Sequence, residues 1–128
     1  MRHYSRGFTL IELLVVVAII GILSAVGVVS YSGYKTSAEK KQAEITLNSI
    51  YLAEQEYKSN NGEYYYNTST SNLVTNLFDG IDDLSEQSYT FKTTNANTLT
   101  ITATKKTNTS CTISITQTNK KPNVNNSC

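Results

Sequence analysis

The sequence is short, nearly neutral and poor in the groups that catalysis uses. Its 128 residues carry 11 basic and 10 acidic side chains, which gives a formal charge of +1. This length suits one small globular domain with an anchor, and the charge balance argues against a strongly polyanionic partner. His3 is the only histidine, and we find neither a nucleotide-binding loop nor a pair of nucleophile and base. We therefore predict no enzymatic activity, no metal site and no cofactor.

The N-terminal segment is the most informative part of the chain. No charged residue occurs from Leu13 to Tyr34, a run of about 22 residues against the ~20 that a bilayer-spanning helix needs. Glu12 stands near the start of this apolar stretch, where a carboxylate is costly and is therefore a candidate functional residue. The sequence predicts a transmembrane helix over residues 8–34.

Basic residues predict the orientation of that helix. Arg2 and Arg6 precede it and nothing basic follows until Lys35, so we expect a cytoplasmic N-terminus and an exported C-terminal part. The apolar run is too long for a secretory signal peptide, whose core has 7–15 residues and is followed by a cleavage site. An unprocessed membrane anchor is the simpler alternative, but it explains neither Gly7 nor the position of Glu12.

The segment Gly7-Phe8-Thr9-Leu10-Ile11-Glu12 resembles the N-terminus of type IV prepilins and of the pseudopilins of type II secretion, as does the later run Ala18-Ile19-Ile20-Gly21-Ile22-Leu23. The resemblance implies that residues 1–7 form a leader peptide, that a separate prepilin peptidase cleaves between Gly7 and Phe8, and that the new amine of Phe8 is methylated. It also implies that Glu12 acts in filament assembly.

One position departs from the family pattern. Many pilins have a proline where this chain has Val29, and a proline kinks a helix by removing a hydrogen bond. A kink or local melting at this point is therefore in question, although Gly27 and Gly33 could soften the same region.

A second helical pattern follows over residues 35–58. It is rich in helix-forming residues, and an apolar stripe runs along it through Ala43, Leu47, Ile50, Tyr51 and Tyr57. Glu54 falls in the same stripe and fits it poorly. Asn60-Asn61-Gly62 supplies a stop. We expect the amphipathic helix to pack on a sheet.

The remainder is predicted as a connecting loop over residues 59–88, with room for one short helix, and a small antiparallel sheet over residues 89–116. Three stretches alternate apolar and polar residues, beginning at Tyr89, Leu99 and Cys111. The sequence thus predicts an α+β fold, in which a long N-terminal helix packs on a three-stranded antiparallel sheet. The exported globular domain would comprise residues 35–128.

Cys111 and Cys128 are the only cysteines. In an oxidising compartment an even pair predicts a disulfide, with two free thiols as the alternative. Such a bridge would tie down residues 111–128. It resembles the C-terminal disulfide-bonded loop of type IVa pilins, which major pseudopilins generally lack, and it therefore favours a pilus subunit.

Two weaker patterns remain. The acidic turn at residues 79–83 lacks the ligand spacing of a calcium-binding EF-hand loop, so a solvated turn is the preferred interpretation. The lysine pairs Lys105-Lys106 and Lys120-Lys121 could contact DNA, but paired lysines on loops are usually just solvated.

The resemblance implies a structural subunit, major or minor, of a type IV pilus-like filament that polymerises through its apolar helix. Its partners would be other pilin subunits, the prepilin peptidase and an inner-membrane assembly platform, and it would sit in the cytoplasmic membrane before it joins an extracellular or periplasmic filament. The alternatives are a pseudopilin of a secretion or DNA-uptake apparatus, and a membrane-tethered module for adhesion or DNA capture.

Overall fold

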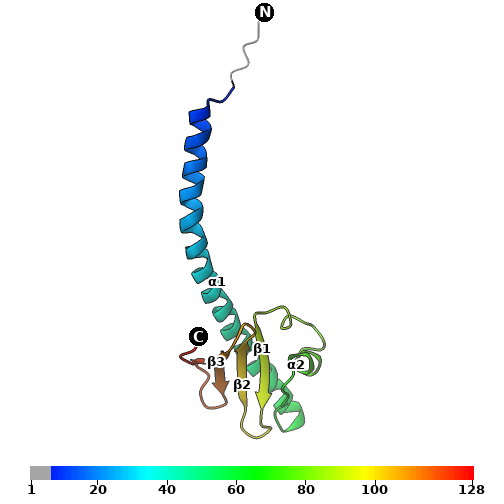
Figure 1. Ribbon diagram of the computed structural model, residues 1–128. Coiled ribbons are helices and arrows are strands. Elements are labelled where there is room, and N and C mark those ends of the chain that lie inside the picture. The colour runs from blue at the N-terminus through cyan, green and yellow to red at the C-terminus, as the bar shows by residue number, and fades with distance from the viewer. Residues whose placement is uncertain (1–6) are drawn as a thin grey trace, which may run out of the picture. The chain divides into compact units, whose positions relative to one another are not determined.

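The computed structural model describes residues 7–128 and divides the chain into two units, residues 1–37 and 38–128. Arg2, His3 and Arg6, and all of the predicted leader except Gly7, lie outside the described residues. Helix α1, Leu10–Asn61, contributes to both units (Figure 1).

The first unit is an uncovered apolar helix. Every described residue from Gly7 to Ser37 is exposed, including large side chains such as Leu14, Ile20 and Val28. By length and composition alone the helix could cross a membrane. It is α-helical through Val29 without interruption, so the structure shows no local melting where many pilins have a proline. Apolar surface on this scale requires lipid or other protein chains around it.

In the second unit α1 turns one face toward the core. Its buried residues are Ala43, Thr46, Leu47, Ile50 and Glu54, spaced by three and four as one stripe of an α-helix requires. The predicted stripe is confirmed at Ala43, Leu47 and Ile50, while Tyr51 packs against the core from a partly buried position.

The sheet has four antiparallel strands in the order β1-β2-β3-β4. They are β1 Tyr89–Thr94, β2 Thr100–Lys105, β3 Asn108–Thr116 and the two-residue β4 Asn123–Val124. The predicted antiparallel sheet is confirmed, and β4 is an addition that its length hides in the sequence. Phe91, Ala103 and Ile113 lie opposite one another across β1, β2 and β3, and all three are buried.

The chain flanks the sheet on both sides, with residues 67–70 along β1 and the C-terminal tail, which carries β4, along β3. Along β1, the Thr70 hydroxyl accepts the Phe91 N–H at 2.9 Å, and Asn67 accepts the Thr93 N–H at 2.9 Å. Thr70 begins the short helix α2, Thr70–Leu77, which lies beside β1 (Figure 1). Covered edges prevent strand addition, so pairing with another chain through β1 would require this segment to move.

The opposite edge is closed by the C-terminal tail. Cys111 in β3 and Cys128 form a disulfide, as predicted. Between them Asn125 binds β3 three times: its backbone N–H donates to Thr112 at 3.1 Å, its amide donates to Ser110 at 2.6 Å, and its amide oxygen accepts the Thr112 N–H at 3.3 Å. The tail is therefore held by the disulfide, by the pairing of β4 with β3, and by the hydrogen bonds of Asn125.

Candidate functional site

Gly7 has no structural reason to be a glycine. A Cβ atom built at this position would meet no atom within 4 Å, and the residue does not adopt the left-handed backbone that favours glycine. Phe8, beside it, is 93% exposed. Packing within residues 7–128 therefore places no demand on either residue.

Helix α1 begins with a capping box that sequence reasoning missed. The Thr9 N–H and hydroxyl both donate to Glu12 Oε2, at 2.8 Å and 2.9 Å, and the Glu12 N–H donates to the Thr9 hydroxyl at 3.3 Å. A threonine followed three residues later by glutamate, just before an apolar run, is the sequence pattern of this motif. The pattern was therefore present in the sequence.

The capping box gives Glu12 a fixed position and leaves part of it available. Both hydrogen bonds go to Oε2, so Oε1 has no hydrogen-bond partner among residues 7–128. The carboxylate also lies at the helix N-terminus, where the helix dipole favours a negative charge. Glu12 can thus keep its cap and still accept a second donor.

The second unit also exposes apolar groups on α1. Ile45 is 62% exposed and Leu52 is 67% exposed. They are seven positions apart, about two helical turns, so they share one face of the helix. Leu47, between them, is fully buried against the sheet. The amphipathic half of α1 therefore has a second apolar face outside the core.

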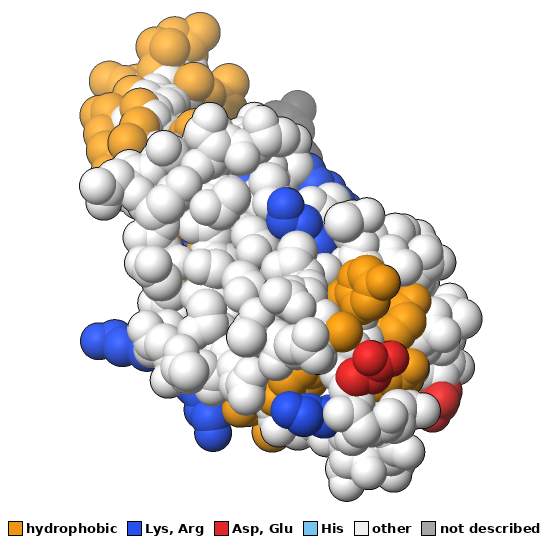
Figure 2. All heavy atoms as spheres, turned by 90° about the horizontal axis from the view of Figure 1, so that it is seen from below, with side chains coloured by type: hydrophobic (Ala, Val, Ile, Leu, Met, Phe, Trp, Pro, Cys, Tyr) orange, Lys and Arg blue, Asp and Glu red, His pale blue; other side chains and the backbone are white. Residues whose placement is uncertain are grey.

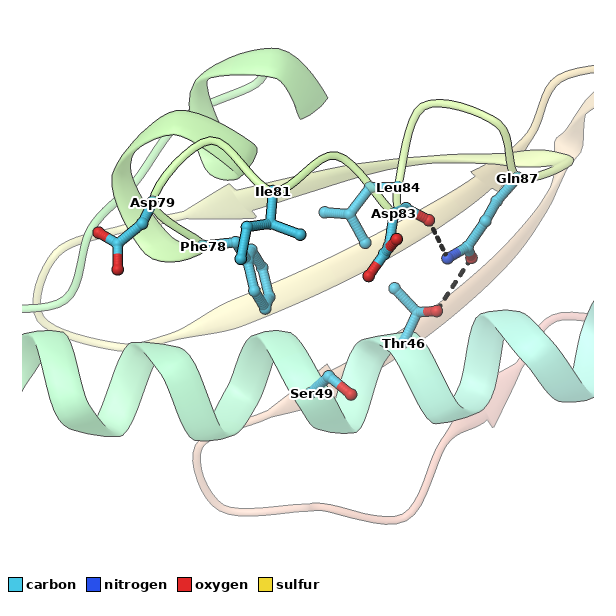
Figure 3. Close-up of a pocket in the computed structure, with 8 residues that line it drawn as sticks. All are labelled: Thr46, Ser49, Phe78, Asp79, Ile81, Asp83, Leu84 and Gln87. Carbon is cyan, nitrogen blue, oxygen red and sulfur yellow. Dashed lines mark hydrogen bonds between the residues drawn. The ribbon is translucent and has the colours of Figure 1, made fainter.

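A pocket of about 420 Å³ opens between α1 and the loop after α2 (Figure 3). On the side of α1 the pocket is lined by Thr46 and Ser49. Thr46 donates a hydrogen bond to Gln87 Oε1 at 2.9 Å, and Gln87 donates to the Asp83 carbonyl at 2.9 Å. The remaining lining residues are Phe78, Asp79, Ile81 and Leu84. No histidine, cysteine or lysine lines the pocket, and its polar links hold the loop to the helix.

The loop itself is fixed by its acidic turn. Asp82 Oδ1 accepts the N–H groups of Leu84 and Ser85 at 3.3 Å and 2.9 Å. The Ser85 side chain and, to a smaller extent, these N–H groups lower the pKa of the Asp82 carboxyl. Within residues 7–128 no three histidine, cysteine or acidic side chains gather as a metal site would need.

The four lysines considered for DNA do not form one group. Lys105 ends β2, whereas Lys120 and Lys121 follow β3, at the other end of the sheet; five strand steps span about 17 Å. Lys105 lies 3.7 Å from the Glu39 carboxylate, Lys106 donates to the Ser85 carbonyl, and Lys120 lies over the Tyr51 ring. On the face in Figure 2 the lysines are scattered, and hydrophobic side chains crowd the N-terminal helix. DNA contact stays a prediction.

Comparison with known proteins places the N-terminal segment in a family. A family model for the prokaryotic N-terminal methylation motif matches residues 2–28. A fimbrial protein of Neisseria meningitidis serogroup B is 37% identical over 75 residues, which are 59% of this chain and 44% of that protein. A type IV major pilin of Myxococcus xanthus is 38% identical over 60 residues, 47% of this chain and 27% of that pilin.

A type IV major pilin of Neisseria gonorrhoeae is 45% identical over 67 residues, 52% of this chain and 36% of that pilin. The chain spans less than half the length of these curated relatives. No solved structure matches significantly. The family model thus matches the segment that contains Gly7, the capping box and much of the uncovered helix.

Proposed function

We propose that this chain, which carries the N-terminal methylation motif of type IV pilins, is a structural subunit of a type IV pilus-like filament. It polymerises through α1. The observation that carries the proposal is the first unit: a helix of apolar side chains, all exposed, with one carboxylate held at its start. Such a helix suits a membrane before assembly and a bundle of identical helices afterwards.

Two features of the second unit support the helix as the assembly element. Ile45 and Leu52 extend the exposed apolar surface of α1 beyond the membrane segment. The β1 edge of the sheet is covered by residues 67–70, and the other edge is β4, a strand of only two residues. Association by strand addition is therefore disfavoured, and helix packing is the available route.

Glu12 would set the register between subunits. After cleavage the Phe8 amine carries a positive charge near the start of the helix. A charge buried in a helix bundle needs a partner, and Glu12 Oε1 is open to one. We infer that the Phe8 amine of a neighbouring subunit occupies this position, while Thr9 keeps its bonds to Oε2.

Processing between Gly7 and Phe8 follows from the same segment. Packing within residues 7–128 does not require glycine at position 7. We infer that a requirement for glycine there comes from another protein, the prepilin peptidase. The subunit would span the cytoplasmic membrane once, with a cytoplasmic N-terminus, before the assembly platform moves it into the filament.

Electron microscopy of a strain that lacks the gene tests the proposal, together with the abundance of the subunit in material sheared from cells. We expect the filaments to disappear in the deletion strain and to return when the intact gene is restored. Filaments that persist unchanged, with the subunit absent from the sheared fraction, would instead indicate a membrane-tethered module.

A further inference from the structure

Glu54 is an acidic residue in the core. It is 0% exposed and lies on the buried stripe of α1, one turn after Ile50. No other Asp or Glu among residues 7–128 is buried. A carboxylate in such a place is costly unless hydrogen bonds or a counter-charge compensate it.

The partners of Glu54 join three parts of the unit. Its Oε2 accepts the Tyr65 N–H at 2.9 Å. The carbonyl of Tyr65 accepts the Thr93 hydroxyl of β1 at 3.0 Å, and the same hydroxyl oxygen accepts the Asn67 N–H at 3.0 Å. Residues 65–67 are therefore held on one side by α1 and on the other by β1. We call these residues, with Glu54 and Thr93, the junction.

The hydrogen bonds at the junction do not fully compensate the burial of the Glu54 carboxylate. Glu54 Oε1 is buried and has no hydrogen-bond partner among residues 7–128. Burial raises the pKa of the Glu54 carboxyl to about 7, and the Tyr65 N–H lowers this pKa to a smaller extent.

No charged group contributes to that shift. Lys58, one turn further along α1, points its ammonium at the Tyr64 ring, 4.2 Å from the centroid. On β1 the one charged residue, Lys92, is on the exposed face. Helix α2 has no titratable residue. The remaining titratable groups near the junction in sequence are Tyr51, Glu56, Tyr57, Glu63, Tyr64, Tyr65 and Tyr66.

We propose that Glu54 is a proton-controlled latch: as a neutral acid it closes the junction between α1, residues 65–67 and β1, and loss of its proton loosens that junction. The ionised form would place an unpaired charge in the core with one N–H to stabilise it. Opening the junction admits water to the carboxylate. Because residues 65–67 lead into the segment that covers the β1 edge, the edge would loosen with them.

The sign of the pH dependence follows from the direction of the shift. The folded state holds this proton more tightly than the unfolded state does. The stabilisation is therefore complete below the ordinary pKa of 4.5, decreases as the pH rises toward about 7, and is absent above it. From pH 5 to pH 8 the unfolding equilibrium constant should rise roughly 50- to 100-fold through this group alone.

The test uses the full-length chain in detergent micelles. Urea unfolding is followed by tyrosine fluorescence at pH 5 and pH 8, and the Tyr65 amide is followed by NMR across that range. Glu54→Gln keeps an oxygen acceptor for the Tyr65 N–H but cannot ionise. Glu56→Gln, an exposed neighbour on the same helix, is the matched control.

We expect the unfolding equilibrium constants of the wild type and of Glu56→Gln to rise from pH 5 to pH 8. The rise in Glu54→Gln should be at least tenfold smaller. The Tyr65 amide shift should titrate near pH 7 in the wild type and stay flat in Glu54→Gln. If the unfolding constants of the wild type and of Glu54→Gln changed equally from pH 5 to pH 8, the proposed latch would be overturned. A Tyr65 amide with no inflection between pH 5 and pH 8 would also overturn it, and this wild-type measurement stands even if Glu54→Gln fails to fold.

Discussion

At the scale of single residues, Glu12 combines two roles that one substitution can separate. Its hydrogen bonds with Thr9 cap the helix, whereas its negative charge is what a neighbouring amine would recognise. Glutamine also serves at this position of a capping box but carries no charge. Alanine at position 9 has the reverse effect, since it removes the hydroxyl and keeps the charge.

We therefore predict that Glu12→Gln is stable in the membrane but assembles at least tenfold less filament, while Thr9→Ala assembles at nearly the wild-type level. Filament yield is measured in sheared material from strains without the wild-type subunit, and membrane content of the subunit is the control. Equal loss in both variants would assign the effect to the cap and not to the charge.

The residues also show where sequence reasoning succeeded and where it failed. Ala43, Leu47 and Ile50 were identified by helical spacing because apolar residues on a helix face report burial directly. Glu54 has the same spacing, but its type argued against burial, and only the tertiary structure shows that Tyr65 supplies a donor. The capping box could have been predicted from Thr9 and Glu12, because their spacing and the apolar run that follows are the pattern of this motif.

At the scale of elements, α1 presents different apolar faces for different purposes. Leu47 is fully buried in the core, whereas the side chain of Leu52, on a different face of the helix, is 67% exposed. The same substitution at the two positions should therefore have different consequences.

Leu47→Ala should reduce the free energy of unfolding by about 2–5 kcal/mol, as the loss of a buried leucine does. Leu52→Ala should change it by less than about 0.5 kcal/mol but reduce the yield of filaments. Urea unfolding and sheared-filament yield are measured on both variants. A stable Leu52→Ala subunit that assembles normally would remove this face from the proposed interface.

The strands illustrate a limit of pattern recognition. Alternation located β1, β2 and β3 because each offers two or three buried residues at every second position, and Leu99 extends the pattern just before β2. Strand β4 has two residues, too few for any periodicity, and it exists because the disulfide and Asn125 bring the tail to β3. The connection between β2 and β3 is short, since β2 ends at Lys105 and β3 begins at Asn108.

At the scale of the whole molecule, the two units differ in what stabilises them. The second unit has its own core, a covered β1 edge and a disulfide, whereas no residue from 7 to 37 in the first unit is buried by the described part of the chain. The pairing of the cysteines was predictable from their number, but the separation of the two lysine pairs was not, because it depends on sheet register.

Loss of the disulfide should act on the second unit alone. Cys128→Ser is expected to lower its free energy of unfolding by about 2–5 kcal/mol and to expose the tail to proteolysis. Membrane insertion should be unchanged, since residues 8–34 are untouched. Urea unfolding of oxidised wild type, reduced wild type and the variant checks this, and the variant should match the reduced protein. Free thiols in unreduced exported protein would contradict the bridge.

The central claim is that this chain is processed at Gly7 and then built into a filament through its apolar helix. Mass spectrometry of subunits from sheared filaments tests it most directly, with Gly7→Val as the matched variant. We expect subunits that begin at methylated Phe8, and a Gly7→Val chain that stays in the membrane with residues 1–7 attached. Filament subunits that retain Met1 to Gly7, or a Gly7→Val chain that is cleaved and assembled normally, would contradict it.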